Sequence, residues 1–326
     1  MQEQAQGILD SIKNWFSDAM RASKDLGGSN QALALQFIAK GQFREAVFRL
    51  NMALKFKPND PELWYLLGRC YILLDQKQDA IEPLRKVIRH KSTHEEARFL
   101  LASADPSTPE NLMPHTYPVE LVKEYFGGIA SEYDMVHVEA MGYRGHVVIA
   151  ELVKQYLPPP DGNLIAADIG CGTGIMGPFL KQFTAELRGI DLCEEMTDLA
   201  FIRSDADAET FYDEVETRDA RDYLLKRVIP SIDLITAAYS VNYMGGLSAV
   251  FDGAKNALKP GGFLIFTTDQ FDGNGYHLLR DLQRFGHSES YIRSQVERVG
   301  FKLHEIKPVE VYKDIPSFGV VCQHVG

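Results

Sequence analysis

The sequence predicts an α/β fold in which an α-helical module of short repeats precedes a doubly wound parallel sheet. Two observations predict the sheet: apolar runs end in acids at Asp168 and Asp191, and a glycine-rich turn with a helical segment follows the first run. A third observation, a pattern that recurs after 34 residues, predicts the helical module. With 326 residues, the chain is long enough for two such domains.

Composition and charge exclude several classes of protein. The net charge is −11, and residues 105–326 hold 19 basic against 33 acidic residues, so we expect no nucleic-acid partner. The chain has no apolar run long enough to span a membrane and no signal-peptide pattern at its start, which predicts a cytoplasmic location. The four cysteines are scattered, without C-x-x-C spacing, and nothing in the sequence requires a metal.

The first 104 residues are predicted to be helical. Residues 1–26 form an amphipathic pattern in which basic and acidic residues balance, which favours a helix that caps the next domain over one on a membrane. Residues 27–104 hold 12 basic against 8 acidic residues, so this part could attract an acidic partner, although solvated helix faces explain the charge equally simply. Its repeat pairs Gly41, Ala46, Leu50, Ala53 and Pro58 with Asp75, Ala80, Leu84, Val87 and Ser92, and its second unit adds Trp64, Leu67, Gly68 and Tyr71.

This pattern resembles the tetratricopeptide repeat (TPR), a helix–turn–helix unit of 34 residues. We expect two repeats and a capping helix, residues 95–104, within the module 27–104. Residues 105–118 contain four prolines and predict a linker. The second domain is then expected over residues 119–326.

The turn after Asp168 carries glycines at alternating positions, Gly170, Gly172 and Gly174. Glycine permits positive φ and lets a ligand approach the bare backbone, and a helix N-terminus follows. The next predicted strand ends at Asp191, where an acid can hold the two hydroxyls of a ribose. The spacing indicates a nucleotide-like ligand; the alternative is an ordinary strand-to-helix turn, against which Asp191 argues.

The segment Asp168-Ile-Gly-Cys-Gly-Thr-Gly174 resembles motif I of the class I S-adenosylmethionine (SAM)-dependent methyltransferases. The resemblance implies a seven-stranded, Rossmann-like sheet and SAM as cofactor. It also implies that residues 215–220 form a third strand, although a plain surface acid there is the alternative. The cofactor-binding residues that it implies are Asp168, Gly170, Gly172 and Gly174 at the loop, Asp191 and Leu192 at the ribose, and Asp219 and Ala220 at the adenine.

Other segments extend the resemblance over most of the chain. Residues 231–238 predict the fourth strand, and residues 257–269 resemble a turn followed by the fifth strand, which ends in Asp269. Residues 300–306 and 319–324 predict a final antiparallel hairpin. The fourth strand is followed by Tyr239, not by Asn-Pro-Pro-Tyr, which disfavours adenine or glutamine-amide methylation. Phe126, Ala130, Tyr133 and Asp134 resemble the segment that forms a helical lid over SAM, so residues 119–157 are expected to be that lid.

Tyr133 is expected either to contact the cofactor or to be a core aromatic residue. With its repeats, the chain resembles the bacterial TPR-containing predicted methyltransferases of small-molecule type.

Two residues are candidates for catalysis. His287 is predicted to begin the helix over residues 288–299, where the resemblance implies a histidine facing the site and where the helix N-terminus favours neutral imidazole. A structural role for His287, as a helix cap or under the lid, is the competing possibility. Tyr243, after the fourth strand, could orient the acceptor, and His137 on the lid is the alternative base.

The sequence therefore predicts a SAM-dependent methyltransferase that acts by in-line transfer on a small-molecule or carrier-bound acceptor. Because SAM is already activated, the protein needs mainly to align donor and acceptor. The TPR module is expected to bind a partner or to mediate oligomerisation. The alternatives are a protein methyltransferase that grips its substrate with the TPR module and a SAM-binding scaffold without catalysis.

Overall fold

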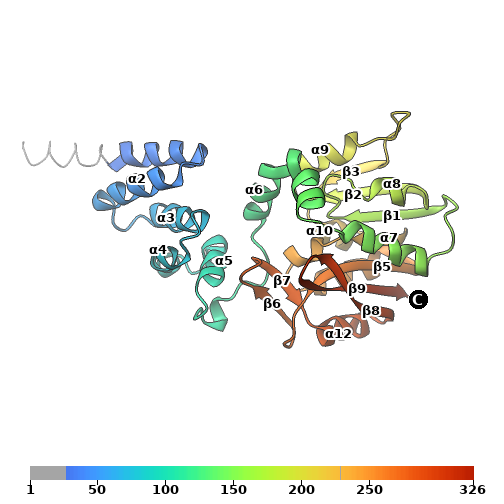
Figure 1. Cartoon of the computed structure of the whole chain (residues 1–326). Helices are drawn as coiled ribbons and strands as arrows, with labels where there is room; N and C mark the ends of the chain where they lie inside the picture. The colour runs from blue at the N-terminus through green and yellow to red at the C-terminus, as the bar shows by residue number, and fades with distance from the viewer. Residues whose placement is uncertain (1–26, 228) are drawn as a thin grey trace, which may run out of the picture. The chain divides into compact units, whose positions relative to one another are not determined.

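The computed structural model describes residues 27–227 and 229–326 (Figure 1). The chain divides into two compact units between Pro114 and His115, which lie inside the segment predicted as a linker. We call them the helical unit and the sheet unit. The amphipathic helix predicted for residues 1–26 lies outside the described residues. Within the described ranges, no helix combines the length and the apolar character needed to cross a membrane.

The helical unit is a series of short helices in which each packs against the next. Helices α3 and α4 approach closely at Gly68, where a Cβ atom would lie 2.7 Å from Leu84 Cγ. Asp60 caps α3 by accepting hydrogen bonds from the backbone of Glu62 and Leu63. After the helical residues 27–39, the elements are α2 (Phe43–Phe56), α3 (Pro61–Leu73), α4 (Lys77–His90), α5 (Glu95–Ala104) and the 3₁₀ turn η1 (Glu110–Leu112).

The sheet unit is built on one sheet with the strand order β3-β2-β1-β4-β5, all parallel, extended by β9 and β8 on the β5 side. The order reverses between β1 and β4, and in such sheets ligands bind outside the carboxyl ends of the strands at that point. The strands are β1 (Leu164–Ile169), β2 (Thr184–Asp191), β3 (Glu214–Thr217), β4 (Ile232–Ala237), β5 (Leu258–Gln270), β6 (Tyr276–Leu279), β7 (Arg284–His287), β8 (Phe301–Tyr312) and β9 (Ile315–His324).

The doubly wound, Rossmann-like class is confirmed, but the sheet has nine strands and not the predicted seven. The two additional strands are the hairpin β6–β7, which joins the sheet only where β7 pairs with Asp269 and Gln270 at the end of β5. Strands of four residues show too little alternation to be recognised in a sequence. The final hairpin, β8 and β9, is present as predicted.

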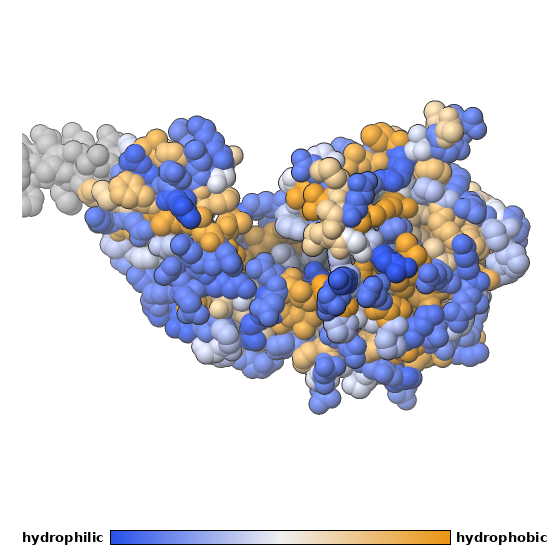
Figure 2. All heavy atoms as spheres, in the orientation of Figure 1, coloured by the Kyte–Doolittle hydropathy of each residue, from blue (hydrophilic) through white to orange (hydrophobic). Residues whose placement is uncertain are grey.

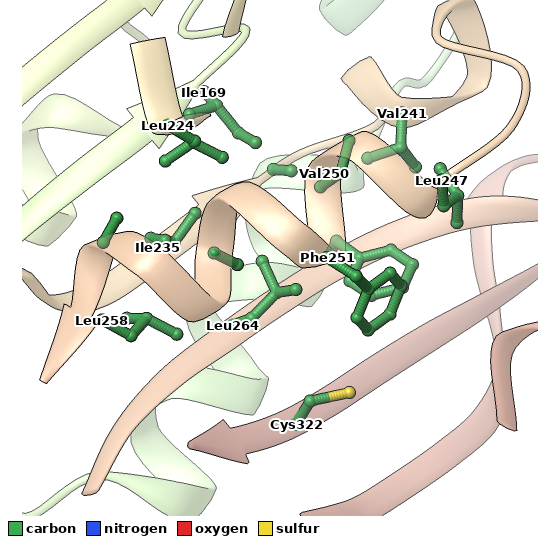
Figure 3. Packing of buried hydrophobic residues seen from close by; sticks show 14 of the residues in the cluster. Ile169, Leu224, Ile235, Val241, Leu247, Val250, Phe251, Leu258, Leu264 and Cys322 are labelled. Atoms are coloured by element: carbon green, nitrogen blue, oxygen red, sulfur yellow. The ribbon is translucent and has the colours of Figure 1, made fainter. Parts of the chain in front are cut away.

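Two apolar layers cover the sheet, one on each face, because successive side chains of a strand point to opposite sides. On β5, Leu264 and Phe266 belong to one cluster and Ile265 to the other. Figure 3 shows the first cluster, with Val250 and Phe251 of α11 beside strand residues. The helices that contribute to this first layer are α10 (Ala220–Leu225), α11 (Ser248–Ala257) and α12 (Glu289–Val299). The helices that contribute to the second layer are α7 (Gly145–Tyr156), α8 (Gly177–Leu180) and α9 (Glu194–Ile202).

The segment before α7 covers the carboxyl ends of the strands, whereas α7 itself, expected to belong to the lid, packs in the second apolar layer. The lid is therefore limited to residues 119–140. It consists of α6 (Val119–Ile129), the 3₁₀ turn η2 (Ala130–Glu132) and the π-helix η3 (Asp134–Ala140). A further 3₁₀ turn, η4 (Ser240–Tyr243), follows β4.

Candidate functional site

A cavity of about 910 Å³, including its open mouth, lies at the carboxyl ends of β1, β2 and β4. The lid, η4 and the end of β8 complete its walls, and every lining residue belongs to the sheet unit. Three of the predicted site residues, Asp168, Gly174 and His287, do not line it. Those that do are Tyr133, Gly170, Gly172, Asp191, Leu192, Asp219, Ala220 and Tyr243, together with the alternative base His137.

The three glycines of the loop after β1 all have positive φ, from 55° to 78°. A Cβ atom on Gly170 would overlap the side chain of Ser240, and one on Gly174 would lie 3.0 Å from Ala200 Cα. At Gly172, by contrast, a Cβ atom would meet no other atom within 4 Å. The loop thus packs tightly at its two ends and presents bare backbone to the cavity in its middle.

Asp191, the last residue of β2, is held by two backbone donors. Its Oδ2 accepts from Gly172 N at 3.0 Å and its Oδ1 from Cys193 N at 3.0 Å. Burial raises the pKa of this carboxyl group above its usual value, and these backbone hydrogen bonds oppose the rise. Each carboxylate oxygen has a further lone pair, so the group can also accept hydrogen bonds from two hydroxyls in the cavity.

Asp219 lines the cavity as the N-cap of α10, where it accepts from Arg221 N. Its two oxygens also accept from the Arg221 guanidinium, at 3.0 Å from Nε and 2.5 Å from an Nη atom. Burial alone would raise the pKa of Asp219, but hydrogen bonds from Arg221 and the Arg221 charge hold it below its usual value.

Asp168 lies behind the glycine loop and is only 1% exposed. It accepts hydrogen bonds from the hydroxyls of Tyr212 and Thr236, each at 2.8 Å. Burial raises its pKa to about 6, although both hydroxyls oppose the rise. This placement makes it a support of the loop and not a wall of the cavity.

The sequence did not single out Tyr212, which falls in an acid-rich stretch without a motif. Its ring occupies space left by three glycines: Cβ atoms on Gly174, Gly177 and Gly189 would lie 3.1, 2.8 and 2.9 Å from its ring carbons. No local pattern reveals this contact, because the partners are spread over three segments. The sequence did contain one sign of this contact, the glycines themselves, since Gly177 and Gly189 lie outside the positions of the glycine-rich motif.

Aromatic side chains line a large part of the cavity in a continuous series of ring contacts. Neighbouring centroids lie 4.6 to 6.2 Å apart. The series runs Tyr117, Tyr243, Phe126, Tyr133, His137, Tyr312 and Tyr239. We call these seven residues the aromatic wall.

His137 is the imidazole of the aromatic wall and lies in the π-helix η3, a kind of helix often found at functional sites. It stacks on Tyr133 with a centroid distance of 4.6 Å. Its Nδ1 is 2.8 Å from the Tyr312 hydroxyl, and its Nε2 is 3.4 Å from the hydroxyl of Tyr125. Burial, followed by the Arg284 charge, lowers the pKa of His137 below its usual value of 6.5, so the ring is neutral at pH 7.

Tyr239 of the aromatic wall also belongs to a hydrogen-bond network with Asp269, Arg284 and Ser317. Arg284 Nε donates to Asp269 Oδ2 at 2.6 Å, and its guanidinium also donates to the Tyr239 hydroxyl. That hydroxyl donates to Asp269 Oδ1 at 2.6 Å. Tyr239 has a φ of 72°, an uncommon conformation for a bulky residue, which the network and the packed rings maintain.

His287 is fully buried at the end of β7, away from the cavity, so the expectation that it faces the site is wrong. Its Nε2 lies 2.6 Å from Gly245 O and must donate, because a carbonyl can only accept. Its Nδ1 then accepts from the Thr268 hydroxyl at 2.5 Å. Burial lowers its pKa to about 4 and keeps it neutral, and neither nitrogen is left to take a proton from a substrate.

The lid is attached to the glycine loop through Asp134. Its Oδ1 accepts from the Thr173 hydroxyl at 2.7 Å, and its Oδ2 is paired with Arg203. Arg203 Nε also donates to Thr173 O at 2.7 Å. In the ranges that the structure describes, no group of three His, Cys, Asp or Glu side chains is arranged to hold a metal.

Comparisons with known proteins agree with this architecture. Residues 141–306, about half of the chain, match the family model described as "Methyltransferase domain", and residues 39–104 match one described as "Anaphase-promoting complex, cyclosome, subunit 3". The ubiquinone biosynthesis O-methyltransferase of Paraburkholderia phymatum is 31% identical over 102 residues, which are 31% of this chain and 42% of that protein. The enzyme of the same name from Hydrogenovibrio crunogenus is 25% identical over 119 residues, which are 36% of this chain and 47% of that protein. The chain thus spans less than half the length of these relatives.

Among solved structures, the magnesium protoporphyrin IX methyltransferase of Synechocystis PCC 6803 is 18% identical, with a TM-score of 0.49, over 63% of this chain and 99% of that one. The 1,6-didemethyltoxoflavin-N1-methyltransferase of Burkholderia thailandensis is 15% identical, with a TM-score of 0.48, over 65% and 92%.

The fold and the family match define the class of protein: a Rossmann-like methyltransferase domain that follows a TPR-like helical module. The chain belongs to the family described as "Methyltransferase domain", and SAM is the cofactor that the sequence predicts for the loop after β1. The residues present suit that cofactor, since bare backbone at Gly172 and the free lone pairs of Asp191 face one cavity.

Proposed function

We propose that the chain methylates an oxygen atom of a small-molecule acceptor held against the aromatic wall. One observation carries the proposal: a single cavity joins the glycine loop, Asp191 and Asp219 to an aromatic region that contains one neutral imidazole. An oxygen acceptor is supported by the two curated relatives described above, which are O-methyltransferases by name.

The cofactor end of the cavity would bind SAM through five residues. The backbone of Gly170 and Gly172 would meet its amino-acid part, Asp191 would accept from both ribose hydroxyls, and Asp219 with Ala220 would meet the adenine. SAM supplies a methyl group already activated on sulfur, so the task left to the chain is alignment, exclusion of water and removal of a proton. Asp134, through Thr173 and Arg203, would keep the lid closed over this end.

His137 takes the place of His287 as the proposed base. With Nδ1–H donating to the Tyr312 hydroxyl, Nε2 carries the free lone pair, and its contact with Tyr125 at 3.4 Å is long enough to be replaced by an acceptor hydroxyl. Tyr243 would orient the acceptor, since its hydroxyl makes no hydrogen bond to any described residue and the residue lines the cavity. His287 would support Gly245, two residues after Tyr243.

The helical unit would bind a partner and take no part in the chemistry. Its described residues include exposed large apolar side chains, such as Phe48 at 59% and Leu73 at 48%. Figure 2 shows hydrophobic residues among hydrophilic ones on the visible face of this unit. A net charge of +4 over residues 27–104 would favour an acidic partner.

Two substitutions test the proposed function. Asp191→Asn should weaken SAM binding by about tenfold or more, because a charged acceptor of two hydrogen bonds is lost. The matched control is Asp198→Asn, an exposed residue on α9. Calorimetry measures both, and unchanged affinity in folded Asp191→Asn would contradict the cofactor assignment.

His137→Gln should leave SAM affinity intact and lower methyl transfer about 10²-fold. Transfer from radiolabelled SAM into the low-molecular-weight fraction of a cell extract measures the rate. In the parent, the rate should fall as the pH drops below the lowered pKa of His137, because the protonated ring cannot accept a proton. Full turnover by the folded variant would rule out His137 as the base.

A further inference from the structure

The charged residues that line the cavity are all at its cofactor end. Asp191 ends β2, and Arg218, Asp219 and Arg221 follow β3. Within the part of the chain that the structure describes, the remaining lining residues carry no carboxylate, ammonium or guanidinium group, and His137 is neutral. The seven residues of the aromatic wall therefore carry no charge at pH 7.

The nearest buried charges are already neutralised. Arg284, whose side chain is 13% exposed, pairs with the fully buried Asp269. Asp269 accepts in addition from the hydroxyls of Tyr239 and Ser317. A carboxylate acceptor would find no unpaired cation, and an amine would find no unpaired carboxylate, so either would lose its hydration without compensation.

The polar groups that remain free at the aromatic wall are few and uncharged. The Tyr133 and Tyr243 hydroxyls make no hydrogen bond to any described residue, and His137 Nε2 has only its contact of 3.4 Å with Tyr125. The other surfaces are ring faces and edges, which favour flat rings in stacked or edge-to-face contact. Such a region selects the shape of a bound molecule through the rings, and it fixes the orientation of that molecule through the two tyrosine hydroxyls as donors and His137 Nε2 as acceptor.

We propose that the acceptor is an uncharged, flat ring bearing a hydroxyl group, a phenol or the enol of a conjugated ring. The proposal rests on the proposed function and specifies its substrate class. In the transfer, the hydroxyl O–H bond breaks and its proton passes to His137 Nε2. The oxygen forms the new O–CH₃ bond, and the S–CH₃ bond breaks with its electron pair going to sulfur, so charge and atoms balance.

Five of the seven residues of the aromatic wall lie outside the family match over residues 141–306, whereas Tyr239 and Tyr243 lie inside it. Tyr117, Phe126, Tyr133 and His137 precede it, and Tyr312 follows it. The cofactor residues Gly172, Asp191 and Asp219 lie inside it. Acceptor choice thus depends mainly on the lid, the segment before it and the last hairpin, together with Tyr239 and Tyr243 after β4.

Calorimetry on the full chain saturated with S-adenosylhomocysteine, which prevents turnover, tests the substrate class. The probes are catechol, benzoate, benzylamine and cyclohexanol at pH 7.5: an uncharged hydroxylated ring, an anion, a cation and a hydroxyl without a flat ring. Catechol should bind about tenfold more tightly than each of the others. Equal or tighter binding of benzoate, benzylamine or cyclohexanol, or no binding of catechol, would overturn the proposal. Failure of S-adenosylhomocysteine itself to bind would instead refute the proposed function.

Two variants examine the separate contributions of hydroxyl and ring. Tyr243→Phe should weaken catechol binding about fivefold, the value of one hydrogen bond. Phe126→Leu should reduce the preference for catechol over cyclohexanol, because it keeps apolar volume and removes a ring. Tyr156→Phe, whose ring lies against His304 outside the cavity, is the control and should change neither. Wild-type selectivity in both cavity variants, with S-adenosylhomocysteine bound, would place the acceptor elsewhere and overturn the proposal.

Discussion

Replacing Asp168 with asparagine is expected to change how the stability of the sheet unit depends on pH. The folded chain holds this carboxyl group at a pKa of about 6, against a usual value of 3.8. Between these values the group is protonated when folded and ionised when unfolded, so unfolding releases a proton and stability falls as the pH rises. Asparagine removes the titration and retains an acceptor for the Tyr212 hydroxyl.

The size of this change in stability follows from the difference between the pKa of Asp168 in the folded chain and its usual value. Two pKa units correspond to about 3 kcal/mol, of which about 2 kcal/mol falls between pH 4.5 and pH 7.5. Asp168 is 1% exposed, so solvent screening reduces this value little. The stability of Asp168→Asn relative to the parent should therefore rise by about 2 kcal/mol from pH 4.5 to pH 7.5.

The distribution of chromophores makes the assay selective. Both tryptophans, Trp15 and Trp64, precede the sheet unit, whereas every tyrosine except Tyr65 and Tyr71 belongs to it. Urea unfolding followed by near-ultraviolet circular dichroism of tyrosine reports mainly on the sheet unit, and tryptophan fluorescence reports on the helical unit. Asp161→Asn, an exposed loop variant, controls for the loss of one negative charge.

If the free energy of unfolding differs between variant and parent by the same amount at both pH values, the reasoning is refuted, because Asp168 then does not titrate between pH 4.5 and pH 7.5. The comparison must be with the parent at each pH. His287, with a folded pKa of about 4, acts in the same window with the opposite sign, so the two effects partly cancel in the parent.

Two further predictions follow from the same structure. His287→Gln should destabilise the sheet unit at pH 7 by about 1–3 kcal/mol, because two buried hydrogen bonds are disturbed, while the folded variant keeps methyl transfer within about threefold of the parent. In the parent, His287 makes the free energy of unfolding fall as the pH drops from 6.5 towards 4, and urea unfolding should show that the variant lacks this contribution. A loss of turnover of about 10²-fold or more in the folded variant would instead restore His287 as a catalytic residue. A shortened chain that begins at Pro114 should bind SAM as tightly as the full chain does, because all residues that line the cavity follow His115. Calorimetry measures the affinity, and loss of binding in a folded shortened chain would show that the helical unit completes the site.

The sequence alone predicted the architecture because its signals are local. One strand–turn–helix unit and the strand after it determine which residue types are needed at positions 170, 172, 174 and 191. Any chain with this loop needs glycine where φ is positive and an acid at the end of the next strand. The repeats are likewise short-range, since a small residue such as Gly68 meets the next helix along the chain, at Leu84. The hairpin β6–β7 was missed because its strands are four residues long.

Only the tertiary structure decided which side chains face the acceptor. His137 and Tyr312 are 175 residues apart and meet because the lid folds over the end of β8, a contact that leaves no spacing pattern in either segment. His287 shows the reverse case: its position near a helix start suggested a base, but the register of β7 against β5 turns its ring towards Thr268 and Gly245 and away from the cavity. Local motifs determine the loop that binds a cofactor, whereas the environment of a single titratable side chain depends on every element packed around it.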